Sequence, residues 1–542
     1  MKSFNCLAAL NLLLPLFVFA NSSKKDSQNG YELPKPEVRK VMVLELAKQV
    51  GRIDGEGLLP RENRPESWGK TVEKLSVEAV EAQTLYDLGR VFKRFNASYP
   101  NLHANVYMIP ELDEKKAIGT LKFPFKFSPV RVDRQYKISN FRIVVSKSSK
   151  TDLKNGDELV SINSRPLQKW TDENFIFCKF PYREQCEIEF FDNFRNELLS
   201  WNRHQSLELT VHRNGKELKF AVTPEVRSDQ PDDETDSQRP CGISPLRYKG
   251  FSLVYEGQNL CAFESQKDNR IVALRMKSFV YQEVPFAVLD GEVQIFWNNY
   301  WKKKSSSVKS LILDVIDNYG GQSPVPYFAL FYSQPYQELY VQFKKIDEFE
   351  QKEILESLFW GDKGKEIWFE NIKKDGSFAQ TENGGFLPPI PQFCAEPNKD
   401  CREGLFKPRK NNFTGQVKVL MNHWCISSCV GFVSNIKALL KNRVQTFGIP
   451  DSGDSAYSRL AVFVSPLSNG EIESKVAPMK KARTPDKPEP WVRQVAAVTR
   501  STNKNGNVLS GKPQYIDVWV PRKWNQTDDE WAASVFDRAT GQ

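Results

Sequence analysis

The segment from Val417 to Leu440 places the strongest constraint on the fold of this chain. It begins with the apolar run V-K-V-L-M, which has the length and composition of a buried strand. A polar turn with two cysteines and two serines follows, and then a helical stretch, Phe432 to Leu440. A strand that turns sharply into a helix exposes the turn side chains and directs backbone N–H groups toward a neighbouring group. A serine in this turn is therefore a candidate nucleophile.

The sequence around this segment predicts a multi-domain α/β protein. From residue 241 onward, apolar strands alternate with helical stretches, a pattern typical of an α/β core. We place this core at 241–542, with an insert rich in aromatic, Gly and Pro residues at about 340–410. The last part of the core, after the nucleophile turn, is predicted to be rich in β-strands. At 542 residues the chain is too long for a single hydrophobic core.

The region before the core divides into three parts. Residues 21–135 form a mostly helical region, with apolar residues three and four positions apart, and this region carries His103. Residues 137–225 alternate as short strands with Asn-Gly turns, which predicts a small β domain. Residues 226–240 are charged and contain proline, as expected for a linker.

The first 20 residues have the pattern of a secretory signal peptide. Lys2 precedes an apolar stretch, and the small-residue site V-F-A precedes a polar segment. The apolar stretch is short for a membrane span, although an uncleaved anchor is the alternative. We therefore expect an exported protein, periplasmic or secreted, with no stable membrane span after the signal is removed.

Export changes the interpretation of the cysteines. Without Cys6, eight of the nine remain, and an even number in an oxidising compartment favours disulfides over metal ligands. No metal is predicted, and a cysteine nucleophile is the disfavoured rival to serine. Pairing of neighbours is the simplest connectivity. It joins Cys178 to Cys186, Cys241 to Cys261, Cys394 to Cys401, and Cys425 to Cys429.

The charge pattern does not favour nucleic acid as a partner. The formal charge of +9 is small for this length, and Lys and Arg are scattered apart from the short run at 302–304. A solvated surface explains this distribution better than a nucleic-acid or lipid-binding patch.

Three motifs occur in a fixed order along the core. The first is L-D-V-I-D-N-Y-G-G, which ends in Gly320 and Gly321. The second is V-L-M-N at 419–422, followed five residues later by Ser427, and the third runs from Arg443 to Gly448 and on to Gly453. Together they resemble the tail-specific, or C-terminal processing, serine proteases, and among them the tricorn-like and chlamydial protease-like branch. The 137–225 region resembles a PDZ domain, which also belongs to that arrangement and binds extended peptides.

The resemblance implies roles for residues at the serine turn. Ser427 takes the place of the nucleophile, and Ser428 supplies the following backbone N–H. Gly320 and Gly321 would provide the second donor of an oxyanion hole. The residues alone also allow a helix-capping serine pair, or an exchange of roles between Ser427 and Ser428.

In much of the family, the Gly-rich loop of the third motif carries the general base. In this chain the general base must come from elsewhere. That loop contains a lysine in the processing proteases, whereas Asp454 stands there in this chain. The tricorn-like branch uses an N-terminal histidine, and the segment L-H-A-N-V resembles its motif, which makes His103 the predicted base. The acid that would orient this histidine is not identified, because Ser510 stands where relatives have glutamate. Four acids are the alternatives: Asp454, Glu473, Glu489 and Asp517.

We therefore predict an exported serine endopeptidase that forms an acyl-enzyme on Ser427 with His103 as general base. Its partners would be protein or peptide substrates, and no cofactor is required. The alternative is a catalytically inactive relative that acts as a peptide-binding module. A glycosidase with paired carboxylates has no supporting spacing.

Overall fold

The computed structural model of the chain describes most of the regions defined above. The described residues are 31–55, 68–99, 101–112, 120–122, 125–131, 141–148, 152–169, 206–223, 225–227, 246–279, 287–321, 324–328, 330–331, 339–359, 361–392, 394, 398–403, 413–453, 458–479, 490–503, 505–509, 516–523 and 526–541. The predicted signal peptide, and all but two residues of the predicted linker, lie outside them. No helix in these ranges is long and apolar enough to cross a membrane.

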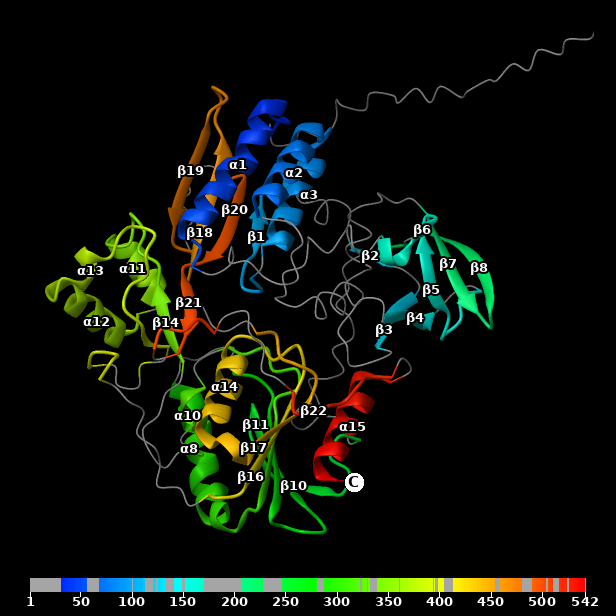
Figure 1. Cartoon of the computed structure of the whole chain (residues 1–542), viewed down its shortest axis with the longest axis vertical. Helices are drawn as coiled ribbons and strands as arrows, with labels where there is room; N and C mark the ends of the chain where they lie inside the picture. Colours follow the sequence, from blue (N-terminus) through cyan, green and yellow to red (C-terminus); the bar gives the residue numbers. More distant parts are fainter. Residues whose placement is uncertain are drawn as a thin grey trace, which may run out of the picture.

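A seven-stranded sheet forms the centre of the core region (Figure 1). Its first three strands are antiparallel neighbours, and the following four strands each run parallel to the one before. Parallel strands with helical connections are the arrangement that the alternating sequence pattern predicts. In sheet order the strands are β10 (Phe251–Glu256), β11 (Leu260–Ser265), β12 (Ile271–Met276), β13 (Ser310–Asp314), β16 (Gln416–Met421), β17 (Val444–Gly448) and β22 (Val518–Trp519).

Helices cover both faces of this sheet (Figure 1). Alternate residues of a strand point to opposite faces, so that Leu311 and Leu313 of β13 pack in one hydrophobic cluster and Ile312 in another. The first cluster includes residues of α8 and α14, and the second includes the C-terminal helix α15. The helices of this region are α8 (Ala287–Phe296), a π-helical turn (Trp297–Trp301), α9 (Lys302–Lys304), α10 (Val325–Phe328), α14 (Ser428–Leu440) and α15 (Asp528–Thr540).

The N-terminal helices pack on strands from the far end of the chain. A four-stranded antiparallel sheet has the order β1-β20-β18-β19, and α1 lies against it in a common hydrophobic cluster. The helical N-terminal region and the strand-rich C-terminal part are therefore joined in one unit. Its elements are α1 (Pro36–Ile53), α2 (Trp68–Glu81), α3 (Leu85–Ser98), β1 (Val106–Met108), the 3-10 turn Pro110–Leu112, β18 (Arg459–Pro466), β19 (Ile472–Ala477) and β20 (Val492–Ala497).

The region predicted as an insert forms a helical module tied to the C-terminal part. Its strand β14 pairs with β15 on one side and with β21, a continuation of the C-terminal strands, on the other. Buried residues of its helices belong to the same hydrophobic cluster as α1 to α3. The elements are β14 (Tyr340–Phe343), α11 (Lys352–Phe359), α12 (Lys363–Lys374), α13 (Ser377–Gln380), β15 (Ile390–Pro391) and β21 (Thr499–Thr502).

Another, six-stranded sheet is formed mostly by strands within residues 137–225, with β3 before them. Its strands β7 and β8 form a hairpin around Asn214 and Gly215, both with positive φ, as an Asn-Gly two-residue turn requires. Residues 170–205 lie outside the described residues. The strands are β3 (Phe125–Arg131), β4 (Phe141–Ser148), β5 (Glu158–Ile162), β6 (Arg165–Pro166), β7 (Leu207–Arg213) and β8 (Lys216–Val222), with a two-stranded β2 (Thr120–Lys122) and β9 (Glu225–Arg227) beside them. The α/β multi-domain architecture is thus confirmed.

Two of the four predicted disulfides are present. Cys394 is bonded to Cys401, and Cys425 to Cys429. Cys261 is also disulfide-bonded, and Cys241, its predicted partner, lies outside the described residues, as do Cys178 and Cys186.

A buried charge cluster fixes the carboxyl end of β13. The Asp314 carboxylate is fully buried and accepts hydrogen bonds from the Tyr248 hydroxyl at 2.5 Å and from Arg275 at 3.1 Å, with Arg247 at 3.4 Å. Burial alone would raise the pKa of Asp314, but the two arginines and the tyrosine outweigh it and lower the pKa. Arg275 also donates to the carbonyl of Ile316, so that the cluster holds the turn that follows the strand.

Replacing Asp314 should destabilise the protein strongly. Asp314→Ala leaves two buried guanidinium groups without their counter-charge, a loss that costs about 3–5 kcal/mol in buried pairs. The free energy of unfolding, measured by urea titration, should fall by this amount. Asp268→Ala, which removes an exposed ion pair with Arg270, is the matched control and should change it little. Equal effects of the two substitutions would contradict the role assigned to the cluster.

Candidate active site

Ser427 lies in the short turn between β16 and α14 with an unusual backbone conformation. Its φ is 60° and its ψ −122°, and helix α14 begins at the next residue. Positive φ is uncommon for residues with a side chain and costs of order 1–3 kcal/mol, which the surrounding structure must offset. A strained serine between a strand and a helix is the geometry that presents a nucleophile.

The Ser427 side chain does not cap the helix that it precedes. Although Ser427 occupies the N-cap position of α14, its hydroxyl makes no capping hydrogen bond. The neighbouring Ser428 hydroxyl, by contrast, donates to the carbonyl of Gly321 at 2.9 Å. The two serines therefore differ, because Ser428 is engaged in a structural bond and Ser427 is not.

Gly320 lies directly against the serine turn. A Cβ atom built on Gly320 would lie 2.8 Å from the Ser427 Cβ and 2.8 Å from the Ser428 nitrogen, closer than non-bonded atoms approach. Its φ of 79° is also a left-handed conformation that favours glycine. Two independent requirements thus select glycine here, and the predicted glycine and serine motifs meet in space.

Two backbone N–H groups at this junction are candidate oxyanion donors. The Gly320 N–H already donates to Asn318 Oδ1 at 2.9 Å. Among the described residues, no acceptor binds the N–H of Ser428, the first residue of α14, or that of Gly321. The first N–H groups of a helix have no partner within the helix and carry partial positive charge. Of the three predicted donors, Ser428 and Gly321 are therefore the ones free to bind an anion.

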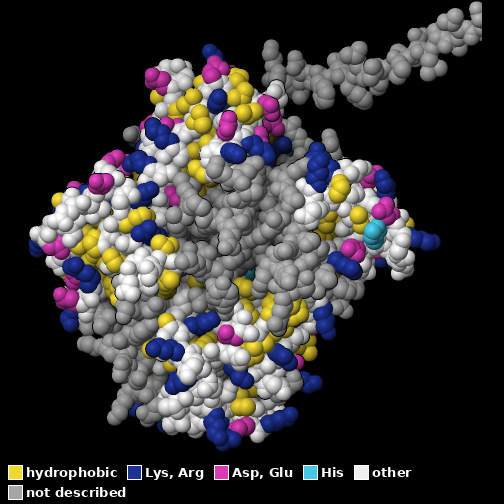
Figure 2. Space-filling view, in the orientation of Figure 1, with side chains coloured by type: hydrophobic (Ala, Val, Ile, Leu, Met, Phe, Trp, Pro, Cys, Tyr) yellow, Lys and Arg dark blue, Asp and Glu magenta, His cyan; other side chains and the backbone are white. Residues whose placement is uncertain are grey.

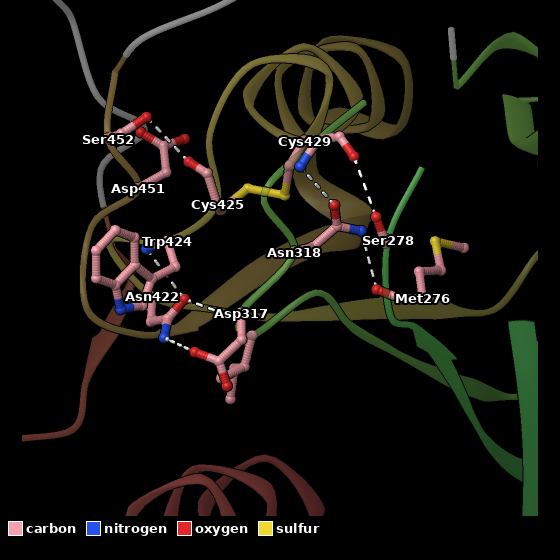
Figure 3. Close-up of a disulfide and its surroundings, with 12 residues drawn as sticks. Met276, Ser278, Asp317, Asn318, Asn422, Trp424, Cys425, Cys429, Asp451 and Ser452 are labelled. Atoms are coloured by element: carbon pink, nitrogen blue, oxygen red, sulfur yellow. Dashed lines mark hydrogen bonds between the residues drawn. A yellow bond between two sulfur atoms is a disulfide. The ribbon is translucent and has the colours of Figure 1, made fainter. Parts of the chain in front are cut away.

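Asn318 connects three segments around the serine turn (Figure 3). Its buried side chain donates to the Met276 carbonyl at 2.9 Å and accepts from Gly320, and its own carbonyl accepts from the Ile426 N–H at 3.4 Å. The residue thereby ties the end of β12, the glycine turn and the serine turn together.

A second link joins the ends of β13 and β16. The Asn422 amide donates to the Asp317 carboxylate at 2.6 Å, while the Asp317 N–H donates back to Asn422 Oδ1 at 3.0 Å (Figure 3). The carboxyl ends of neighbouring parallel strands are where α/β proteins bind ligands. This reciprocal pair fixes the separation of the two turns there.

The disulfide between Cys425 and Cys429 spans the serine turn (Figure 3). Their Cα atoms are 5.2 Å apart, and both side chains are fully buried. From the other side, the hydroxyl and the N–H of Ser452 both donate to the Cys425 carbonyl at 3.1 Å. The strained turn is therefore restrained by covalent and hydrogen bonds.

His103 lies in the turn between α3 and β1. Its N–H donates to Asn101 Oδ1 at 2.8 Å, and its carbonyl accepts from Arg459 at 3.5 Å. Among the described residues the Ser427 hydroxyl has no hydrogen-bond partner, so the predicted bond to His103 is not formed in this structure. The chain from Ser452 to Arg459 nevertheless touches the serine turn at one end and His103 at the other.

The four alternative acids fall into two groups. Asp517 accepts hydrogen bonds from the N–H and hydroxyl of Thr446 at 2.7 and 2.9 Å, and Glu473 is exposed on β19. Asp454 and Glu489 lie outside the described residues, as does Ser510. In the described ranges no group of three His, Cys, Asp or Glu side chains could hold a metal ion.

A second histidine, His423, is buried beside the serine turn. Only 7% of it is exposed, and neither ring nitrogen has a hydrogen-bond partner in the described part of the chain. Burial lowers its pKa from 6.5 to about 4, partly opposed by the nearby Asp317 carboxylate. The imidazole is therefore neutral at pH 7.

Asn318 and Asn422 stand in the sequence motifs, but no role was predicted for them. Both follow the last residues of parallel strands, and a polar amide at such a position is a signal for a connection between loops. Asp317 was missed as well, and its positive φ of 61° could not be anticipated from an aspartate alone.

Comparison with solved structures identifies the fold. Mature CPAF complexed with lactacystin superposes with a TM-score of 0.55 at 13% sequence identity, covering 93% of this chain and 98% of that chain. The chain has a CPAF-like fold. Mature CPAF alone gives a TM-score of 0.53 at 12% identity, over 92% of this chain and 96% of that chain. No protein-family model and no curated protein sequence matches the chain. The similarity to CPAF therefore shows the fold, and it extends over nearly the whole length of both chains.

Gly320→Ala should destabilise the protein by more than the cost of placing alanine at the positive φ of Gly320. Gly215 has a similar φ of 77° but open space around its Cα, so Gly215→Ala measures the conformational cost by itself, about 1–2 kcal/mol. Gly320→Ala should lower the free energy of unfolding by about 1–3 kcal/mol more, as for other overpacked sites. Urea unfolding of both variants provides the measurement. Equal losses would mean that the close approach to Ser427 is not a real constraint.

His423 should make the protein sensitive to mild acid. Because its folded pKa is depressed to about 4, between about pH 6.5 and pH 4 the unfolded chain binds a proton that the folded protein does not. The free energy of unfolding should therefore fall by about 3 kcal/mol over this range on account of His423.

The measurement is urea unfolding at pH 7 and pH 4.5 for wild type and His423→Gln. The variant should lose less stability than wild type between the two pH values. His212→Gln is the control, because His212 is exposed and paired with Glu217. An unchanged pH dependence in His423→Gln would show that this histidine is not held neutral by the fold.

Proposed function

We propose that the protein is an exported serine endopeptidase with Ser427 as its nucleophile. The observation that carries this proposal is the strained Ser427 backbone, at a strand-to-helix turn packed against Gly320, with a hydroxyl that does not cap the helix. The chain also shares its fold with mature CPAF, which has been crystallised in complex with lactacystin. A fold alone does not assign an activity, so the site carries the argument.

In the proposed reaction, Ser427 Oγ attacks the carbonyl carbon of a peptide bond. Its proton passes to His103, and the N–H groups of Ser428 and Gly321 stabilise the oxyanion of the tetrahedral intermediate. The C–N bond then breaks as His103 returns the proton to the leaving amine, which leaves an acyl group on Ser427. Water attacks this ester with His103 again as base, and the carboxylate product and free serine are released.

His103 as general base rests on its position in the chain and on an indirect connection. Arg459 contacts the His103 carbonyl, and the same stretch of chain contacts the serine turn through Ser452. Hydrogen bonds between catalytic groups are often long in proteins without substrate and tighten in the substrate complex. We propose that substrate binding brings His103 and Ser427 within hydrogen-bond distance.

The sheet from β3 to β8 is proposed to bind the extended substrate chain as a PDZ-like domain. An antiparallel sheet with open edge strands can add a peptide as a further strand. Export to the periplasm or the outside of the cell is supported by the two disulfides, Cys394–Cys401 and Cys425–Cys429. Acidic and basic side chains occur together over the described parts of the face in Figure 2, as expected for a solvated surface.

Covalent labelling with a serine-reactive fluorophosphonate tests the proposal. Wild type should be labelled, and Ser427→Ala should not. Ser428→Ala should remain labelled, because it keeps the backbone N–H and loses only the hydroxyl bond to Gly321. His103→Ala should be labelled about 100-fold more slowly or worse, the usual contribution of a general base.

Circular dichroism must first show that each variant is folded. If the wild-type protein is not labelled but still binds peptide, the enzyme proposal is rejected in favour of the peptide-binding alternative. Labelling that survives in Ser427→Ala but disappears in Ser428→Ala would move the nucleophile by one residue.

A further inference from the structure

Tyr319 is an exposed aromatic residue in the middle of a buried turn. Its side chain is 55% exposed, although the preceding Asn318 is fully buried and the following Gly320 packs against Ser427. The backbone around it is fixed by the bonds of Asn318 and by the close approach of Gly320 to Ser427. A large, partly apolar side chain is thus held at the surface next to the candidate oxyanion donors.

Trp424 lies beside Tyr319 and is held equally firmly. The two ring centroids are 5.2 Å apart with an interplanar angle of 44°, within the range of favourable aromatic pairs. The Trp424 N–H donates to Asn422 Oδ1 at 3.2 Å, and the next residue, Cys425, is in the disulfide. Because two loops that end neighbouring parallel strands each supply one ring, the pair is a fixed feature of the site.

The aromatic surface continues inward to His423. The ring centroids of His423 and Trp424 are 4.8 Å apart, and His423 is 93% buried. A buried neutral imidazole adds no positive charge to this surface. The three rings therefore form a continuous aromatic surface of which Tyr319 is the most exposed part.

The position of this aromatic surface limits which part of a substrate can reach the rings. Tyr319 is adjacent to Gly320, and Trp424 precedes Ser427 by three residues, so its Cα lies no more than about 11 Å from that of Ser427. An extended peptide advances about 3.3 Å per residue. A substrate whose carbonyl carbon lies at Ser427 therefore brings to the rings a side chain within about three residues of the cleaved bond.

We propose that Tyr319 and Trp424 form a subsite that receives a bulky apolar or aromatic side chain of the substrate, within three residues of the scissile bond. This inference rests on the proposed peptidase function and adds the class of peptide that it prefers. Aromatic surfaces of this kind bind apolar side chains through burial and ring contacts.

Cleavage-site mapping on unfolded casein tests the subsite. Peptides released by wild type, Tyr319→Ala and Tyr319→Phe are identified by mass spectrometry, and each variant is titrated with fluorophosphonate to count active sites. Wild type should cleave preferentially near large apolar residues. Tyr319→Ala should lower this preference about tenfold, the scale of one aromatic contact, while fluorophosphonate still labels Ser427.

Tyr319→Phe keeps the ring and should retain the wild-type preference. Ile295→Ala removes an apolar side chain that is 54% exposed on α8, and it serves as the matched control. Its cleavage profile should equal that of wild type.

Three results would overturn the proposal, and they are distinguishable. An unchanged cleavage profile in Tyr319→Ala, with labelling intact, rejects the subsite and leaves the peptidase function in place. A change in molar mass of Tyr319→Ala, measured by light scattering, would show that the rings contact a second copy of the chain rather than substrate. Wild-type protein that neither reacts with fluorophosphonate nor cleaves casein rejects the peptidase function and the subsite together.

Discussion

The close approach of Gly320 to the backbone of Ser427 and Ser428 is the contact on which the site depends. It brings together two loops more than one hundred residues apart in sequence and leaves no room for a side chain between them. The contact places the Gly321 and Ser428 N–H groups at the same junction and leaves Ser427 in a conformation that a free turn would not adopt. Backbone packing therefore positions the proposed nucleophile and its proposed oxyanion donors.

The surrounding structure keeps this junction in place. Asp314 and its two arginines fix the end of β13 below the glycine turn, and Asn318 ties that turn to β12 and to the serine turn. The disulfide across the serine turn and the bonds from Ser452 act on the other side. Such restraints explain how a strained serine can persist, because they hold the two loops that meet at Ser427.

Much of this arrangement follows from sequence patterns. Strand and helix alternation predicted the α/β core, and the resemblance to the processing proteases implied that Gly320 lies near Ser427. Other features depend on contacts that no local pattern contains. The hydrogen bonds of Asn318 join three separate segments. Because the Gly320 N–H already donates to Asn318, the N–H of Gly321 is the available donor. The joining of α1 to the C-terminal strands is likewise a tertiary effect, because amphipathic helices do not specify which sheet they cover.

The most direct test of the account is to locate the covalent adduct. Wild-type protein is treated with fluorophosphonate, digested with its disulfides reduced, and sequenced by tandem mass spectrometry. The account predicts a single modified residue, Ser427, within the peptide that follows Lys418. An adduct on Ser428 or on a serine elsewhere in the chain, or no adduct on folded protein, would contradict the central claim.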